Sequence, residues 1–238
     1  MAEKYYGMNG YGYCAENPIR FIDHNGRELV IKGNLSNDAL SQLQERTKNR
    51  IQLTRDSETG IISYIINKGK RLKGDAKIIV AIINDPNITV NLITTEKNVT
   101  SMGNLMIGGA FMGNEVSYSI EGDVHINAFQ EVNPIVLGSA DDFTHTAGKM
   151  LLHEVTESYI GAQITQKMGT GVGPATQTDA TNINSVYSRA HNKATPQTPI
   201  FQTMYDRYGR IVYYPAQAVK VEWSVKKGNK SKVIQVLQ

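Results

Sequence analysis

The stretch Leu151–Tyr159 constrains the fold more than any other segment, because its pattern predicts a buried helix that carries three ionisable side chains. Apolar residues lie on two sides of the predicted helix (Ala147, Leu151, Val155 and Ala162 on one face; Met150, Ile160 and Ile164 on another). A helix that is apolar on both sides belongs in a protein core. Charged side chains are costly there unless they are paired or bind a metal ion. We therefore expect a central helix whose ionisable residues have partners.

The spacing of His153, Glu154 and Glu157 meets the requirements of a zinc hydrolase helix. His153 and Glu157 are four residues apart, so a helix places them on one face. Glu154 lies about 100° around the helix from His153, where it can serve a water molecule without being a ligand. We predict that His153 and Glu157 bind zinc and that Glu154 is catalytic. The common zinc-peptidase helix has His at the position that Glu157 occupies here.

The same three side chains also allow an interpretation without a metal. A His and two Glu residues in a core can form a hydrogen-bonded network in which each charge has a partner. In this interpretation, His153, Glu154 and Glu157 hold the helix in place and have no catalytic role.

A catalytic zinc has three protein ligands and an open position for water, so one ligand must come from elsewhere in the chain. His191, in the segment Val186–Ala194, is our candidate because the 34 residues that separate it from Glu157 allow the chain to fold back. This spacing resembles that of gluzincins, whose third ligand lies on a second helix downstream. The chain differs from gluzincins in the acidic ligand, which would lie here on the first helix, with the histidine on the second. Asp179 and His125 are alternatives, and His191 could also be a surface histidine.

Four further residues are candidates for the substrate side of the site or for contacts with the ligands. His145 lies eight positions before His153 and could orient a substrate or cap the helix. His125 alternates with apolar neighbours on a predicted strand, so it points away from them, towards a cleft. Tyr159 or Tyr187 could donate a hydrogen bond to a developing oxyanion, and the sequence does not select between them.

The composition is that of an ordinary globular protein, and the chain is long enough for one large domain or two small ones. The 238 residues are 40% hydrophobic and 20% charged, with a net charge of only +3. The basic run Lys68–Lys73 predicts a solvated turn rather than a nucleic-acid-binding face. Cys14 is the single cysteine, which excludes an internal disulfide and a thiolate zinc cluster. No apolar run approaches the roughly 20 residues of a membrane span, so we expect a soluble domain with neither a membrane span nor a nucleic acid partner.

The predicted elements follow the order of an α+β domain, with a mixed or antiparallel sheet packed on the central helix, similar to zincins. Strands are expected at 29–31, 50–55, 61–66, 88–95, 115–120 and 124–129, with two hairpins within 201–238. Helices are expected at about 36–48, 75–84, 143–168 and up to 194. Residues 99–114 contain four glycines and predict a mobile loop or an irregular ribbon. We expect Val124–Asn127 to be the edge strand that lines the cleft.

The segment Tyr11–Arg27 reads YGYCAENPIRFIDHNGR and resembles the closing motif of the core of Rhs/YD-repeat proteins, especially Bacteroidetes-like members. The resemblance covers only residues 5 to 28, in a dense and unusual pattern. It implies that residues 1–27 close an Rhs core and that residues 28–238 form a variable C-terminal domain, often a toxin. His24 stands where the family usually has the proline of a self-cleavage region, so that activity does not carry over. The alternative is a Gly/Tyr-rich linker with a turn at Asn25–Gly26.

The helix motif and the N-terminal resemblance together predict a zinc-dependent peptidase or other hydrolase that is the toxin domain of a larger Rhs protein. The expected partners are a protein or peptide substrate, the Rhs shell of the parent chain and a cognate immunity protein. As an effector of this type, the domain would be exported or displayed at the cell surface. Two alternatives stay open: a non-enzymatic structural or recognition module, and a nuclease toxin. The near-neutral net charge argues against the nuclease.

Overall fold

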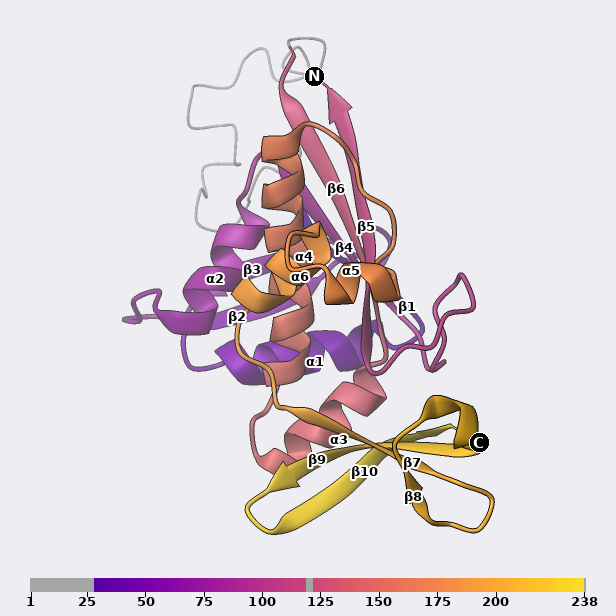
Figure 1. Ribbon diagram of the computed structural model, residues 1–238. Coiled ribbons are helices and arrows are strands. Elements are labelled where there is room, and N and C mark those ends of the chain that lie inside the picture. Colours follow the sequence, from indigo (N-terminus) through magenta and orange to yellow (C-terminus); the bar gives the residue numbers. More distant parts are fainter. Residues whose placement is uncertain (1–27, 119–121, 238) are drawn as a thin grey trace, which may run out of the picture.

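Helix α4 (Lys149–Met168) runs through the middle of the molecule, between a four-stranded sheet on one side and helix α6 (Val186–Lys193) on the other, as Figure 1 shows. The computed structural model describes residues 28–118 and 122–237. An unbroken run of α4 from Met150 to Ser158 is buried, which confirms the prediction of a core helix. The predicted Rhs segment, residues 1–27, lies outside the described residues.

The central sheet is mixed, and its strand order is β1-β4-β6-β5. The strands β1 (Glu28–Gly33), β4 (Ile88–Thr94) and β6 (Val124–Val132) are parallel neighbours, and β5 (Gly109–Tyr118) pairs antiparallel with β6. Helices on its face and separate antiparallel strands elsewhere confirm the predicted α+β class.

The prediction that residues 124–127 form the edge of this sheet is wrong, because β6 lies between β4 and β5. The edge strand beside β6 is β5, and its first half falls in the glycine-rich segment that was expected to be irregular. A bulge between Phe111 and Asn114 interrupts the pairing of β5 with β6. A bulge breaks the alternation of inward and outward side chains, and this hides the strand in the sequence pattern.

The first part of the chain folds as predicted. Helices α1 (Ser36–Thr47) and α2 (Gly74–Ile83) and the hairpin of β2 (Ile51–Arg55) and β3 (Ile62–Ile66) all occupy their expected positions. Their apolar faces pack with β1, β4 and α4 in one continuous core. These elements cover the sheet and the helix and make α4 an interior element on this side.

The predicted long helix from residue 143 is two helices, α3 (Pro134–Thr144) and α4. Asn133 and Pro134 start α3, where the Asn133 side chain accepts hydrogen bonds from two backbone N–H groups of the first turn. His145 ends α3 with a left-handed backbone, at φ 59°, and Gly148 precedes α4 with φ 68°. A continuous helix contains neither conformation, so His145 lies in a turn and not on the first turn of the central helix.

The C-terminal segment forms a second, antiparallel sheet beside α3, drawn in yellow and orange in Figure 1. Its order is β10-β9-β7-β8, with β7 (Ile200–Tyr205) paired to β8 (Ile211–Val212), and β9 (Lys220–Lys227) paired to β10 (Lys230–Leu237). Both predicted hairpins are therefore confirmed, and the pairing of β7 with β9 joins them.

In residues 28–118 and 122–237, no helix combines the length and the apolar character of a membrane span.

The turn before α4 gives a testable constraint, because a side chain at position 148 would meet α1. An added Cβ at Gly148 would lie 2.0 Å from the backbone oxygen of Gln42, in a conformation that already disfavours other residues. We expect Gly148→Ala to destabilise the fold by about 1–3 kcal/mol, seen as a drop of several degrees in Tm by calorimetry. Gly173→Ala is the control, because no atom of the described residues lies within 4 Å of its added Cβ. Equal Tm values for the two variants would contradict this account.

Candidate metal centre

Three side chains that were predicted as ligands lie together at the buried face of α4. His153 Nε2 is 3.2 Å from His191 Nδ1 and 3.6 Å from Glu157 Oε2, and His191 Nδ1 is 2.5 Å from the same oxygen. Ligand atoms about 2.0–2.2 Å from a tetrahedral zinc lie roughly 3.3–3.6 Å apart, so the 3.6 Å separation fits, the 3.2 Å separation is about 0.1 Å too short, and the third must widen by about 1 Å. The three residues could hold a metal ion.

Two helices bring these ligands together. The four-residue spacing on α4 places His153 and Glu157 one above the other. His191 comes from α6, which packs against α4 through its buried residues Val186 and Ala190. The side chain of Ser185 caps α6 by accepting a hydrogen bond from a backbone N–H of the first turn. A short helix with a fixed start and a buried face holds its histidine at a defined place.

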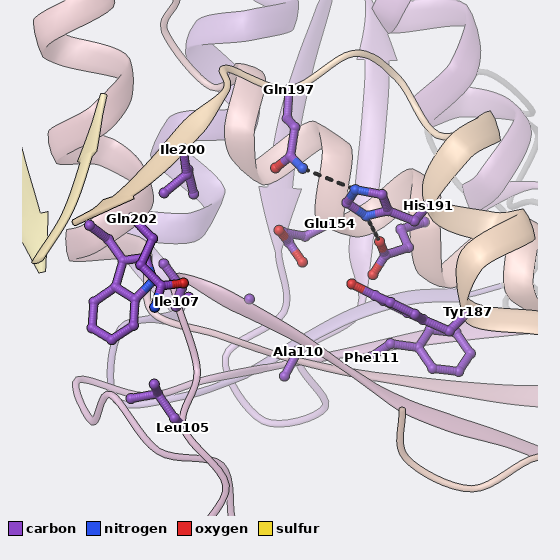
Figure 2. Close-up of a pocket in the computed structure, with 13 residues that line it drawn as sticks. Leu105, Ile107, Ala110, Phe111, Glu154, Tyr187, His191, Gln197, Ile200 and Gln202 are labelled. Atoms are coloured by element: carbon purple, nitrogen blue, oxygen red, sulfur yellow. Dashed lines mark hydrogen bonds and ion pairs between the residues drawn. The ribbon is translucent and has the colours of Figure 1, made fainter. Parts of the chain in front are cut away.

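The backbone after α6 fixes the orientation of His153. Its Nδ1 lies 2.6 Å from the carbonyl oxygen of Thr195. A carbonyl only accepts hydrogen bonds, so Nδ1 carries the proton, and in the neutral ring the lone pair is on Nε2, facing the other two ligands. Thr156 on α4 ties down the same backbone segment by accepting a hydrogen bond from the Thr195 N–H at 3.0 Å. His191 is supported in a similar way, since its Nε2 lies 3.3 Å from the side-chain amide of Gln197 (Figure 2).

Gln130 connects the two glutamates and was missed by the sequence analysis. Its fully buried amide nitrogen, on β6, donates to Glu154 Oε2 at 2.6 Å and to Glu157 Oε1 at 3.1 Å. A signal for it exists, because Gln130 is the one polar residue among the buried even-numbered positions of β6 (Ile126, Ala128, Gln130 and Val132). A polar residue on an otherwise apolar strand face indicates a buried polar partner across the core.

The carboxylate of Glu154 lies directly against the backbone of β5. An added Cβ at Gly109 would lie 2.0 Å from Glu154 Oε2, so only glycine leaves room for the carboxylate at this position of the strand. The glycine-rich segment therefore serves the site, because a larger residue at position 109 would displace Glu154 from α4 or β5 from its neighbour. The sequence showed the glycines but not the side chain that they accommodate.

Burial and neighbouring charges give the two glutamates opposite properties. Burial, and next the charge of Glu157, raise the pKa of Glu154 to about 7. Burial also acts to raise the pKa of Glu157, but hydrogen bonds with His153 and His191 outweigh it and hold that pKa below its ordinary value. Burial acts to lower the pKa of His153, and its bond to Glu157 and the charge of Glu154 reverse this and raise it. Glu157 is thus the anion of the group, and Glu154 exchanges a proton near neutral pH.

A pocket of about 370 Å³ opens next to these side chains. In Figure 2, Tyr187 and His191 lie at one end, Leu105 and Ile107 at the other, and Glu154 between them. The Tyr187 hydroxyl points into the pocket. Burial, and then the charges of Glu157 and Glu154, raise the pKa of Tyr187 to about 12, so the hydroxyl keeps its proton and can donate a hydrogen bond.

The other predicted candidates do not line this pocket. His125 Nε2 lies 3.1 Å from the hydroxyl of Thr89, and the Tyr159 hydroxyl donates to Asp85 at 2.7 Å. His145 lines a different pocket, formed with lysines of the C-terminal sheet. Asp179 forms the capping box of the short helix α5 (Gln177–Thr181), where Thr176 is its partner. Of the candidates for the third ligand, only His191 joins His153 and Glu157 in the described residues.

Comparisons of the chain with protein-family models, with curated proteins and with solved structures gave no match.

The side chains of the site determine which chemistry it can support. Two imidazole nitrogens and one carboxylate oxygen face a common point, and this donor set suits zinc and other divalent ions of the first transition row. A second carboxylate that exchanges protons near pH 7 and a phenol that can donate a hydrogen bond face the adjacent pocket.

The raised pKa values predict how the stability of the metal-free protein depends on pH. The fold keeps a proton on Glu154 that the unfolded chain loses above pH 4.5, so this stabilisation is complete below pH 4.5 and is lost as the pH rises through about 7. The raised pKa of His153 lowers the stability further as the pH rises above 6.5. The lowered pKa of Glu157 affects the stability only below pH 4.5. We expect the Tm of chelator-treated protein to fall between about pH 5 and pH 8. Glu154→Gln should flatten this fall, and a wild-type Tm that rises over the range would contradict the prediction.

Metal affinity tests the third ligand. We expect His191→Ala to weaken zinc binding by more than the roughly 10–100-fold that loss of an outer partner costs, because a ligand is removed. Titration against a chromogenic zinc chelator measures the change, and the circular dichroism spectrum should stay that of the wild type. His125→Ala and Asp179→Ala are the matched controls and should bind zinc as the wild type does. If His191→Ala keeps its zinc affinity and one of the two control variants loses it, the residue replaced in that control is the third ligand.

Proposed function

We propose that residues 28–238 form a zinc-dependent hydrolase domain that cleaves peptide bonds and binds about one zinc ion per chain. The observation that carries this proposal is the convergence of His153, Glu157 and His191 on one point beside Glu154 and an open pocket. A zinc ion held there would lower the pKa of a water molecule in the open position and polarise the scissile carbonyl.

The side chains around the pocket have separate roles in this reaction. Glu154 accepts a proton from the attacking water at the oxygen that Gln130 leaves free, and then gives it to the leaving amine. Gln130 holds the other oxygen, so the carboxylate cannot turn away from the pocket. Tyr187 donates a hydrogen bond from its hydroxyl to the oxyanion that develops on the carbonyl oxygen. As a carboxylate ligand, Glu157 would reduce the positive charge at a bound zinc, so the reaction would depend more strongly on Glu154.

The position of β5 supports a peptide as substrate, in the manner of a zincin. This antiparallel edge strand passes the pocket, and an extended peptide can pair with a free strand edge. The segment after α4 already covers part of the edge, because Val172 pairs with Asn114 and the Ala175 N–H donates to Phe111. The start of the strand, at Gly109 and Ala110, lines the pocket. A short stretch of substrate backbone would therefore bind at this part of the edge.

The charges of the pocket argue against a nucleic acid substrate. Its lining residues, all in the described part of the chain, include Glu154 and Glu157 but neither lysine nor arginine. A phosphodiester would bring negative charge beside these carboxylates, whereas nucleic-acid-binding sites gather basic residues. A neutral peptide bond meets no such repulsion.

The resemblance of residues 5–28 to the end of an Rhs core supports a place for this domain at the C-terminus of a larger, exported or surface-displayed protein. In that setting the hydrolase acts as a toxin on proteins of a target cell. The producing cell then needs an immunity protein that binds the domain and blocks the pocket, and the Rhs shell of the parent chain contacts the domain.

A non-enzymatic module of an Rhs protein is the second candidate, and the contacts of His191 favour it. With Nδ1 at 2.5 Å from Glu157 and 3.2 Å from His153, the three side chains form a hydrogen-bonded network without a metal ion. Such a network can hold α6 against α4, and it would then serve packing or recognition within the parent protein.

Replacement of Glu154 separates the two candidates. If Glu154 is the general base, Glu154→Gln should lower peptide hydrolysis, or toxicity in a sensitive cell, by roughly 10²–10⁴-fold. Zinc content, and the Tm of the zinc-loaded protein at neutral pH, should barely change. The structural candidate instead requires a marked loss of stability, because an amide leaves buried partners uncompensated.

Glu131→Gln provides the matched control for this experiment. Glu131 is a buried glutamate of β6 whose carboxylate accepts hydrogen bonds from Ser101 and does not line the pocket. We expect this variant to keep its specific activity. A Glu154→Gln protein that is active at permissive temperature but unstable would rule out the enzymatic account.

A further inference from the structure

The end of the pocket away from His191 is mostly apolar, with Gln202 as its polar residue, and is built by three separate parts of the chain. Leu105 and Ile107 precede β5, Ile200 lies on β7, and Trp223 lies on β9. Figure 2 shows Leu105, Ile107 and Ile200 on the far side of Glu154 from His191 and Tyr187. The second sheet therefore supplies one wall of the candidate active site.

The register of the second sheet fixes which of its side chains face the pocket. Gln202 on β7 pairs with Trp223 on β9, so the two side chains stand on the same face of the sheet. Ile200 is two residues before Gln202 and shares that face. Phe201, between them, points to the opposite face and contacts Lys226 there. Alternate residues of one strand thus divide between the pocket and the outer surface.

The distribution of charge limits what this apolar end can bind. Among the lining residues, the ionisable groups are Glu154, Glu157, Tyr187 and His191. An ionised side chain of a substrate at the apolar end would lose its hydration and find no charged partner. An uncharged apolar side chain gains from burial against Trp223 and the aliphatic residues.

The volume of about 370 Å³ also limits the size of the bound group. Pockets of this size take small ligands, so a few residues of an extended chain fit and a folded surface does not. Gly109 and Ala110 line the pocket beside Glu154 and leave its middle open. A substrate backbone can therefore continue from the site of reaction to the apolar end.

We propose that Leu105, Ile107, Ile200 and Trp223 form a specificity subsite for an uncharged apolar side chain, next to the peptide bond that is cleaved. This inference rests on the proposed function and names its substrate class, which is extended peptide with an apolar residue beside the scissile bond. It makes the second sheet a specificity element, separate from the residues that carry the reaction.

Trp223 provides a direct test because it is the only tryptophan of the chain. The zinc-loaded full chain carrying Glu154→Gln is titrated with blocked peptides that are identical except for one residue, Leu, Lys or Glu. We expect the Leu peptide to shift the Trp223 emission to shorter wavelength and to bind at least about 10-fold more tightly than the other two. Equal affinities for the three peptides, or no response of Trp223, would overturn the subsite.

A charge placed at the apolar end makes the test sharper. Leu105 is 42% exposed, so Leu105→Asp changes the pocket with little effect on the core. In the Glu154→Gln chain that also carries Leu105→Asp, the Lys peptide should bind more tightly than the Leu peptide, because the new carboxylate is a partner for the ammonium group. Phe201→Ala, on the opposite face of the same sheet, should keep the wild-type order. A Leu preference that survives Leu105→Asp would contradict the inference.

Hydrolysis distinguishes failure of the subsite from failure of the proposed function. The wild-type chain is incubated with peptides from a digested bacterial proteome, and cleavage sites are identified by mass spectrometry. Cleavage with apolar residues enriched at one position next to the broken bond supports the subsite, and cleavage without such enrichment overturns it. If no peptide is cleaved but the Leu peptide still binds selectively at Trp223, the subsite is retained and the hydrolase is rejected.

Discussion

Two glutamates three residues apart lie on the most buried part of the longest helix, and the structure around them is arranged to compensate their charges. An isolated carboxylate in a core is very costly, so each must find donors or a cation. Among the described residues, Glu157 contacts two imidazoles and the Gln130 amide, whereas Glu154 accepts a hydrogen bond from Gln130 and has a pKa raised to about 7. This asymmetry gives one carboxylate the properties of a ligand and the other those of a base.

The elements that satisfy this constraint come from distant parts of the chain. Gln130 comes from β6, His191 from α6, and the carbonyl that orients His153 from Thr195. The close approach of β5 depends on Gly109. The second sheet then closes the pocket on the side away from the ligands. The loop and strands after α6 therefore have a double role, because they orient one ligand and shape the space for a substrate.

Much of the fold and the centre of the site could be predicted from the sequence because both depend on local pattern. The four-residue spacing of His153 and Glu157 fixes their relation within any helix, and the apolar residues around them indicate burial. The partners of Gln130 and Trp223 could not be predicted, because they depend on which strands lie opposite α4 and beside the pocket. The same reason explains the misplaced edge strand and the assignment of His145 to the central helix. A bulge in β5 and a left-handed turn at His145 interrupt the periodic patterns on which those predictions relied.

The separation of His153, Glu157 and His191 is the quantity on which the proposed chemistry depends, and diffraction at the zinc absorption edge measures it most directly. In crystals grown with zinc, the account predicts one anomalous peak between these three residues, with zinc about 2.0–2.1 Å from each nitrogen and 2.0–2.2 Å from the carboxylate oxygen. The 2.5 Å contact between His191 and Glu157 should open to make room for the ion. Zinc bound at His125 or His145 instead, or no peak with that contact intact, would contradict the account and favour a purely structural network.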